Sequence, residues 1–229
     1  MLKMTGISKH FIVGNVKTQA LHPFNLEIKQ GDFVAVVGPS GSGKTTFLNM
    51  AGMLEQPSFG QYEIDGIEVE NLNDKASSRI RNEKIGFVFQ SFNLIPELTV
   101  YDNVDVPLRY RRFSSKERKE RIEKALEQVG LSGRYKHFPP QLSGGQQQRV
   151  AIARSLAGSP SIILADEPTG NLDSKMADGV MTLLHNINKA GTTIIMVTHN
   201  NEQAQEAGRI VHISDGYLSE NTLLKQVIA

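Results

Sequence analysis

The residues from Gly38 to Thr45 have types and a spacing that suit the binding of phosphate. They read Gly-Pro-Ser-Gly-Ser-Gly-Lys-Thr and fit the P-loop pattern G-x-x-x-x-G-K-[ST]. The glycines let the backbone turn with positive φ, so consecutive N–H groups point into one concavity. Lys44 supplies a charge for the β- and γ-phosphates, and the Thr45 hydroxyl is a hard oxygen ligand for Mg²⁺. A plain glycine turn between a strand and a helix explains the glycines but not the Lys-Thr pair.

The elements on either side of this loop are the ones that a phosphate site requires. Residues 33–37 form a short, β-branched apolar run, which predicts a buried strand. Residues 45–50 contain no helix breaker and predict the start of a helix. The dipole of that helix adds to the attraction for an anion.

Two acids, Asp166 and Glu167, directly follow a second apolar run at residues 162–165. Ligands of open α/β sheets bind at the carboxyl ends of the strands, so we expect both acids beside the loop. Asp166 can hold the shell of a Mg²⁺ ion, and Glu167 can polarise a water that attacks the γ-phosphate. An acidic strand end that faces solvent is the alternative, and the P-loop in the same chain favours the catalytic interpretation.

A second glycine-containing string, Leu142-Ser143-Gly144-Gly145-Gln146, predicts another anion site. Ser143 can cap a helix that runs from Gln146 through Arg154, and the two glycines expose its first N–H groups. One nucleotide does not need both phosphate-binding devices, so the second is available for a nucleotide held by another copy of the chain. An ordinary capped helix start explains Ser143 but not the full string.

Composition excludes several classes of function. The 229 residues suit one large domain, or one domain with two lobes. The chain has no Cys, which excludes disulfides, cysteine zinc sites and thiol catalysis. Its net charge of +1 gives no drive toward nucleic acid, and we expect the basic-aromatic cluster at residues 109–112 to be an exposed loop. Neither a signal-type apolar segment nor a membrane span is expected, so any membrane role requires partners.

The order of the patterns along the chain predicts an α/β fold with an inserted helical lobe. A β-rich part with a hairpin at Asp65-Gly66 precedes a strand at residues 85–89. Residues 91–159 look helical, with a capping box from Ser114 to Glu117. The α/β pattern then returns, with a helix from Met176 to Ala190 and a closing hairpin at residues 211–218. The inner face of that helix is expected to contain Met176, Val180, Leu183, Leu184 and Ile187.

These motifs together resemble the ATPase subunits of ABC transporters along essentially the whole chain. The matching strings are residues 38–45, Gln90, residues 142–146, residues 162–167, Asn171-Leu172-Asp173 and His199. Residues 89–96, 98–100 and 166–173 are similar to the lipoprotein-releasing and macrolide-exporter branch, which includes the FtsE-related cell-division ATPases. The resemblance implies a P-loop NTPase (RecA-like) mixed sheet core with an N-terminal antiparallel β part. Residues 1–229 would form one ABC ATPase domain, in which residues 1–90 and 160–229 are the core and residues 91–159 an α-helical subdomain.

The resemblance also implies a role for each matching residue in binding ATP and Mg²⁺. The nucleotide-binding residues of one copy would be Phe11, Gly38, Pro39, Ser40, Gly41, Ser42, Gly43, Lys44, Thr45 and Thr46. Those at the ATP of a head-to-tail partner copy would be Ser143, Gly144, Gly145 and Gln146, and Asp173 would link the two nucleotide sites. Thr45, Gln90 and Asp166 would hold Mg²⁺, and Gln90 would also lie near the attacking water. Glu167 would be the general base, and His199 would contact the γ-phosphate.

Two of these assignments have a specific alternative. Phe11 would stack on adenine, where the family more often has Tyr; from the residues alone, a half-buried strand position is the simpler interpretation. Asn200 stands where the family commonly has Asp, so His199 has no carboxylate next to it in the sequence. His199 could equally be a strand-end histidine near a turn.

The resemblance places the chain on the cytoplasmic face of the inner membrane, as a peripheral ATPase that powers export or lipoprotein extraction. A membrane permease would dock near Gln90, Phe92, Leu94 and Leu98, unless these apolar residues only hold the helical lobe to the sheet. An FtsE-like ATPase that signals to cell-wall enzymes is the alternative. A soluble ATPase of DNA repair or translation would carry long inserts or two fused halves, and a P-loop kinase would not need residues 142–146.

Overall fold

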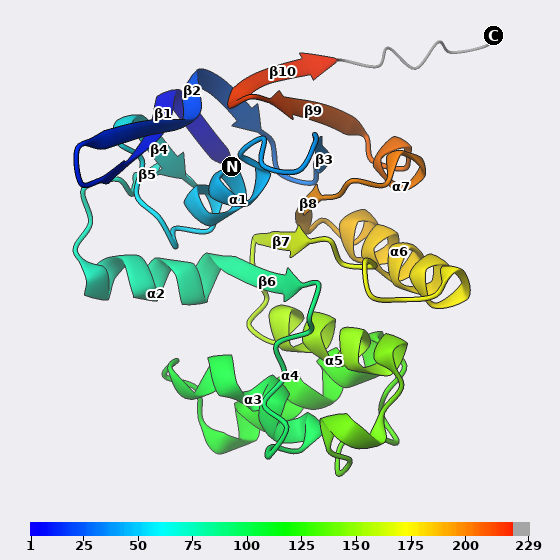
Figure 1. Cartoon of the computed structure of the whole chain (residues 1–229). Helices are drawn as coiled ribbons and strands as arrows, with labels where there is room; N and C mark the ends of the chain where they lie inside the picture. The colour runs from blue at the N-terminus through cyan, green and yellow to red at the C-terminus, as the bar shows by residue number, and fades with distance from the viewer. Residues whose placement is uncertain (222–229) are drawn as a thin grey trace, which may run out of the picture.

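The computed structural model describes residues 1–221, which form two sheets and a group of helices (Figure 1). The larger sheet has the strand order β10-β9-β3-β8-β7-β6. All neighbours in it are parallel except β9 and β10. Its strands are β3 (Phe33–Val37), β6 (Ile85–Phe89), β7 (Ile162–Asp166), β8 (Thr193–Val197), β9 (Arg209–Ser214) and β10 (Tyr217–Asn221).

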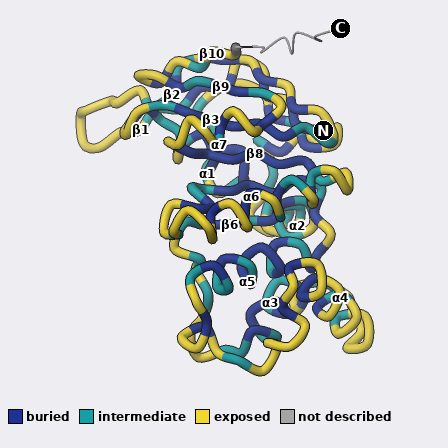
Figure 2. The backbone as a smooth tube through the Cα atoms, turned by 90° about the vertical axis from the view of Figure 1, so that its right-hand side faces the viewer, coloured by how far each residue is buried: buried dark blue, intermediate teal, exposed yellow. Residues whose placement is uncertain are grey.

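The smaller sheet is antiparallel, with the strand order β2-β1-β4-β5. It is built on a long hairpin whose tip is exposed and extends away from the rest of the chain (Figure 2). Its strands are β1 (Leu2–Val13), β2 (Val16–Ile28), β4 (Phe59–Ile64) and β5 (Ile67–Glu68). Asp65 and Gly66, both with positive φ, form the turn between β4 and β5, as the sequence predicts.

The helices fall into two groups. In Figures 1 and 2 the helices α3, α4 and α5 lie below β6 as a separate lobe, whereas α1, α6 and α7 lie along the larger sheet. Their bounds are α1 (Lys44–Ala51), α2 (Asp74–Lys84), α3 (Val100–Arg109), α4 (Ser115–Gln128), the 3₁₀ turn η1 (Pro139–Gln141), α5 (Gly144–Leu156), α6 (Ser174–Lys189) and α7 (Asn201–Gln205). Among residues 1–221, no helix is both long and apolar enough to cross a membrane.

Both faces of the larger sheet are covered, because its parallel strands are apolar on both sides. Along β3, Phe33, Ala35 and Val37 pack into one core with the helical lobe and α6. Val34 and Val36 pack into a second core with α1 and the smaller sheet. The continuous apolar runs in the sequence are therefore buried strands, as expected.

Two local expectations are wrong. Met176 does not lie on the buried face of α6, since its side chain is 37% exposed and packs beside Gly145 of α5. Ala177 and Met181 lie on the buried face together with Val180, Leu184 and Ile187. Met176, in the first turn of α6, lies against the start of α5 instead. Arg111 is not part of a free loop: its guanidinium donates to Asn82 and to the carbonyl of Gly158.

Candidate functional site

The candidate site lies along one edge of the larger sheet, where four neighbouring parallel strands end. In the order β3-β8-β7-β6, these ends lead into the 38–45 loop, His199, the Asp166-Glu167 pair and Gln90. The register pairs Phe89 with Asp166 and Asp166 with Val197. Parallel strands share one carboxyl edge, so motifs far apart in the sequence are brought together.

The 38–45 loop leads into α1 through a left-handed glycine. Gly43 is the N-cap of α1 at φ 110°, with no side-chain cap. A Cβ at this position would lie 2.8 Å from the carbonyl oxygen of Ala20 in β2, so only glycine fits here. The N-terminus of α1 is therefore free of competing side-chain acceptors, which suits an anion.

Lys44 and Ser42 place polar groups inside this loop. The Lys44 Nζ atom donates to the carbonyl oxygens of Gly38, at 2.8 Å, and of Pro39, at 2.7 Å, so its charge is held over the loop. The Ser42 Oγ atom is buried with no hydrogen-bond partner among the described residues. A buried hydroxyl without a partner is unfavourable, and a phosphate oxygen in the loop would satisfy it.

Asp166 faces the same loop from the end of β7. Burial, with a smaller contribution from the Glu167 carboxylate, raises the pKa of Asp166, and the Lys44 ammonium opposes that shift. Its carboxylate and the Thr45 hydroxyl are oxygen donors that fit Mg²⁺, which usually takes one or two protein ligands together with phosphate oxygens. No cluster of three or more potential ligands from His, Cys, Asp and Glu exists within residues 1–221.

Glu167 is fixed by its backbone and by both carboxylate oxygens. It lies at φ 45°, an unfavourable value for a non-glycine residue, and its N–H donates to the carbonyl oxygen of Val197 at 2.9 Å. The His199 Nδ1 atom is 2.7 Å from Oε1, and the Thr198 hydroxyl donates to Oε2 at 3.4 Å. The carboxylate is thus held at the strand edge, mostly shielded from solvent.

These contacts show which carboxylate accompanies His199, given that Asn200 follows it in the sequence. His199 has its carboxylate partner in Glu167, which is remote in the sequence, and does not need an acid at position 200. Asn200 caps α7 by accepting from the N–H groups of Glu202 and Gln203. The His199 side chain is 72% exposed, so its Nε2 edge remains accessible to a ligand at the strand edge.

Gln90 is held by Asn171 on the segment that follows Glu167. The Gln90 amide donates to the Asn171 side chain at 3.2 Å, and the Asn171 amide donates to the Gln90 carbonyl at 3.1 Å. A Cβ on Gly170 would lie 2.7 Å from Gln90 Nε2, so glycine permits this close approach. Gln90 therefore joins the acidic pair at the edge, as the sequence suggests.

The Ser143 string forms the capped start of α5, away from the 38–45 loop. Ser143 Oγ accepts from Gln146 N–H at 3.3 Å, and Gln146 Oε1 accepts from Ser143 N–H at 3.0 Å, a complete capping box. In Figures 1 and 2, α5 lies below β6 and α1 lies above it. The Ser143 string is thus apart from the phosphate loop, although Gly144 lies beside Leu172 and Phe92. Asp173 caps α6 by accepting from Met176 N–H, and the Met176 side chain packs beside Gly145 at the start of α5.

Phe11 lies on the hairpin that contacts the 38–45 loop. The same β1–β2 hairpin contains Ala20, which touches Gly43. The Phe11 ring is 37% exposed, with the Lys9 ammonium 5.0 Å from its centroid. It is more exposed than the half-buried strand position that the residues alone favoured, and an exposed flat ring suits stacking.

Two residues that hold the site, Thr198 and Gln203, are not identified from the sequence, and Asn171 belongs to a matching string without an expected contact to Gln90. Gln203 accepts from the buried Thr169 hydroxyl at 2.7 Å and so ties the segment after Glu167 to α7. Thr198 lies directly beside His199, which is a usable signal. Gln203 carries no such signal, because its partner is 34 positions away.

Comparison with known proteins places these features in one family. The sequence model described as "ABC transporter" matches residues 21–170. An uncharacterized ABC transporter ATP-binding protein of Bacillus subtilis, YknY, is 46% identical, over 94% of each chain. The macrolide export ATP-binding/permease protein MacB of Bdellovibrio bacteriovorus is 44% identical over 100% of this chain, which spans 35% of that longer protein.

A solved structure agrees with the fold. It is described as the dimeric structure of a post-hydrolysis state of the ATP-binding cassette MJ0796 bound to ADP and Pi. It matches with a TM-score of 0.88 and 45% sequence identity, and covers 97% of this chain and 99% of that one. MJ0796 comes from Methanocaldococcus jannaschii.

Proposed function

The chain belongs to the ABC transporter family, as an ATP-binding and ATP-hydrolysing subunit, and from this premise we propose the role of each residue at the strand edge. The observation that carries the proposal is the strand order β3-β8-β7-β6, which lines up the 38–45 loop, His199, Glu167 and Gln90. The loop and Lys44 hold the phosphates, and Phe11 stacks on the adenine. Glu167 accepts a proton from the attacking water, while His199 and Gln90 orient the γ-phosphate and that water.

Thr45, Asp166 and Gln90 are the side chains that would hold Mg²⁺ with the phosphates. The bound ion would neutralise charge on the β- and γ-phosphates during transfer. The Lys44 ammonium opposes the rise in the pKa of Asp166 that burial causes, which favours the ionised carboxylate that a Mg²⁺ ligand requires. The Thr45 hydroxyl is exposed at the first turn of α1, within the same loop.

The second half of each nucleotide site comes from a second copy of the chain. The start of α5 lies apart from the 38–45 loop of its own chain, so residues 143–146 would reach a nucleotide only across a dimer. The related MJ0796 cassette is described as dimeric, which supports this arrangement. We assign residues 91–159 to a helical subdomain that brings this start onto the partner's ATP, with Asp173 beside it.

The test of this role is Glu167→Gln. The amide keeps the size of the side chain but cannot accept a proton, so ATP hydrolysis should slow by about a hundredfold or more while ATP still binds. ATP-bound Glu167→Gln should then accumulate as a dimer in size-exclusion chromatography. Glu202→Gln, an exposed glutamate on α7, is the control and should behave as the wild type. Near-normal turnover of Glu167→Gln would refute the assignment.

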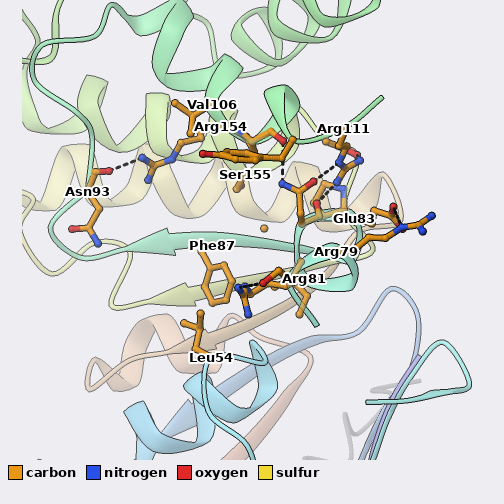
Figure 3. Close-up of a pocket in the computed structure, with 18 of the residues that line it drawn as sticks. Leu54, Arg79, Arg81, Glu83, Phe87, Asn93, Val106, Arg111, Arg154 and Ser155 are labelled. Carbon is orange, nitrogen blue, oxygen red and sulfur yellow. Dashed lines mark hydrogen bonds and ion pairs between the residues drawn. The ribbon is translucent and has the colours of Figure 1, made fainter. Parts of the chain in front are cut away.

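A groove between the sheet and the helical lobe is the proposed docking site for a membrane permease (Figure 3). It has a volume of about 830 Å³, and its apolar wall includes Leu54, Phe87, Phe89, Val106 and Tyr110. Phe89 and Asn93 bring it next to Gln90 and Phe92. Phe92 and Leu94 are half-buried, and Leu94 packs on the core, so they support the groove as well as border it. Leu98 is half-buried on the same segment.

The charges in this groove favour an acidic partner. Arg81, Arg111 and Arg154 donate to the backbone carbonyl oxygens of Met53, Gly158 and Phe92, respectively, which carry no charge. Burial lowers the pKa of Arg111 and of Arg154, a sign that their charge is poorly solvated. Among the lining residues, the described ion pair is Arg79 with Glu83. An amphipathic helix with apolar side chains and a carboxylate would fit.

Docking can be tested at Val106, which lies in the groove wall (Figure 3). Val106→Asp should prevent co-purification with the permease, because it places a carboxylate in an apolar wall that meets an acidic helix. The basal ATPase activity of the isolated subunit should remain. Val13→Asp, at the 78% exposed tip of the β1–β2 hairpin, is the matched control. If Val106→Asp co-purified normally with the permease, the groove would not be the docking site.

Through such a permease the ATPase cycle would drive export or lipoprotein extraction from the cytoplasmic face of the inner membrane. The similarity to MacB, whose name describes macrolide export, favours export over signalling. Co-purification of the tagged chain with its membrane partner, followed by identification of that partner, tests this. A permease with a large extracytoplasmic domain is the expected result, and a division-type membrane partner would contradict it.

A further inference from the structure

Gln148, on α5, joins the helical lobe to both loops that carry the catalytic side chains. It is fully buried, one turn after Ser143. Its Nε2 atom donates to the carbonyl oxygen of Pro168 at 2.5 Å and to that of Phe89 at 3.4 Å. Pro168 directly follows Glu167, and Phe89 directly precedes Gln90. One amide group therefore contacts the backbone beside two proposed catalytic residues.

The orientation of this amide follows from its partners. Both are carbonyl oxygens, which only accept, so the NH₂ group must face them. The Gln148 Oε1 atom is left buried without a hydrogen-bond partner among the described residues. That arrangement is unfavourable for folding, and an apolar side chain of the same length would avoid it. Filling space between α5 and the sheet therefore does not explain a glutamine here.

The segment that Gln148 holds determines where the Glu167 carboxylate points. Gly170 N–H donates to the Glu167 carbonyl at 3.0 Å, which closes a tight turn immediately after the left-handed Glu167. The Thr169 hydroxyl anchors this turn to Gln203 on one side, and Gln148 anchors the Pro168 carbonyl on the other. Without the Gln148 donors, the Glu167–Pro168 backbone loses the one support of its unfavourable φ that comes from the helical lobe.

We infer that Gln148 is a positioning residue that couples the place of α5 to the orientation of Glu167. The inference rests on the proposed function, in which α5 begins with the residues that close on the partner's ATP. Ser143 and Gln148 lie on one helix. When the start of that helix contacts a nucleotide, Gln148 therefore also fixes the position of the Pro168 carbonyl. Hydrolysis thereby becomes sensitive to dimer closure. The same helix forms a wall of the docking groove through Arg154 and Ser155, so a docked partner acts on it as well.

The test is Gln148→Met, which keeps the length of the side chain and removes both donors. The kcat for ATP should fall about ten- to a hundredfold, as expected for a misplaced catalytic group, with KM within about twofold of the wild-type value. Gln147→Met is the matched control. Gln147 donates to the Leu142 carbonyl inside the helical lobe, at 3.1 Å, and its loss should leave kcat nearly unchanged.

A double-mutant cycle with Glu167→Gln separates positioning from a general structural effect. If Gln148 acts through Glu167, adding Gln148→Met to Glu167→Gln should not lower the residual single-turnover rate further. An equal loss in both backgrounds, or a kcat of Gln148→Met within about twofold of wild type, overturns the inference. Should Gln148→Met fail to fold, Gln148→Leu, which is also uncharged and lacks both donors, enters the same cycle.

The outcomes distinguish this inference from the proposed function. Slow hydrolysis by Glu167→Gln with a neutral Gln148→Met defeats only the inference about Gln148. Normal hydrolysis by Glu167→Gln defeats the assignment of the general base itself.

Discussion

The starts of α1 and α5 are both glycine-containing helix N-termini, yet they differ in charge and in capping. The start of α1 has no side-chain cap and has the Lys44 ammonium within the loop. The start of α5 satisfies its own N–H groups with Ser143 and Gln146, and its first turn contains no charged residue. We propose that the first holds the charge of a triphosphate by itself, whereas the second completes a site that is already occupied.

This difference explains why one chain contains both starts. A helix start that binds ATP weakly by itself contributes only when another copy presents the nucleotide. In the proposed dimer, ATP would bind first to the loop before α1 and then recruit α5 of the partner. The predictions below test that division of roles, beginning with the largest expected effect.

Replacing Lys44 should remove most of the affinity for ATP. Lys44→Ala deletes the cation of the α1 start, and charge-assisted hydrogen bonds of this kind account for about 10- to 100-fold in affinity. Isothermal titration with ATP measures the loss. Lys17→Ala, on exposed β2, should bind ATP as the wild type does. If Lys44→Ala retained wild-type affinity, the α1 start would not be the primary holder of the phosphates.

Replacing Ser143 should slow ATP hydrolysis but leave the affinity for ATP unchanged. Ser143→Arg obstructs the exposed start of α5 with a long side chain, so hydrolysis should fall about tenfold or more while ATP affinity of the single chain stays within about twofold. ATPase assays and ATP titration measure the two effects. Ser115→Arg, in the exposed first turn of α4, should change neither. A parallel loss of ATP affinity in Ser143→Arg would place both starts on one nucleotide.

Phe11 should contribute less than Lys44 to the affinity for ATP, and only at the site formed by the loop before α1. Phe11→Ala removes the proposed stacking surface and should weaken ATP binding about fivefold, whereas Phe11→Tyr keeps the ring and the affinity. Affinity for inorganic triphosphate, which lacks a base, should not change. Phe59→Ala removes a ring that is 65% exposed on β4 and serves as the control. An equal effect on triphosphate would show that Phe11 only supports the hairpin.

Asp166 should show a modest stability effect at the same edge. Because burial raises its pKa, the folded chain binds a proton more tightly than the unfolded chain. This group therefore favours folding at low pH, and its contribution is lost as pH rises from the unfolded pKa through the raised folded pKa. Asp166→Asn should have a higher midpoint of thermal unfolding than wild type at neutral pH, with a shallower pH dependence. Exposed Asp178→Asn should not, and a lower midpoint for Asp166→Asn would contradict the sign.

The sequence predicts the strands and motif order well, since continuous apolar runs and fixed glycine spacings are local signals. It identifies Glu167 and His199 separately but not their contact, which depends on the parallel pairing of β7 and β8. Arg111 and Met176 were misplaced for a related reason. A basic-aromatic cluster looks exposed until the carbonyl groups of Asn82 and Gly158 are in place. The side chains buried in the first turn of a helix depend on the neighbouring elements, here the start of α5 beside Met176. Gln148 has no local signal, because its acceptors come from β6 and from the segment after β7.

The most direct test of the shared site mixes two defective subunits in the Glu167→Gln background, which slows hydrolysis. A Lys44→Ala subunit keeps its α5 start, and a Ser143→Arg subunit keeps its phosphate loop. Either variant alone should trap almost no ATP in a dimer, whereas their mixture should trap one ATP per heterodimer, in the one composite site that is intact. If the mixture traps no ATP, or two ATP molecules per heterodimer, the site is not shared between copies and the account is wrong.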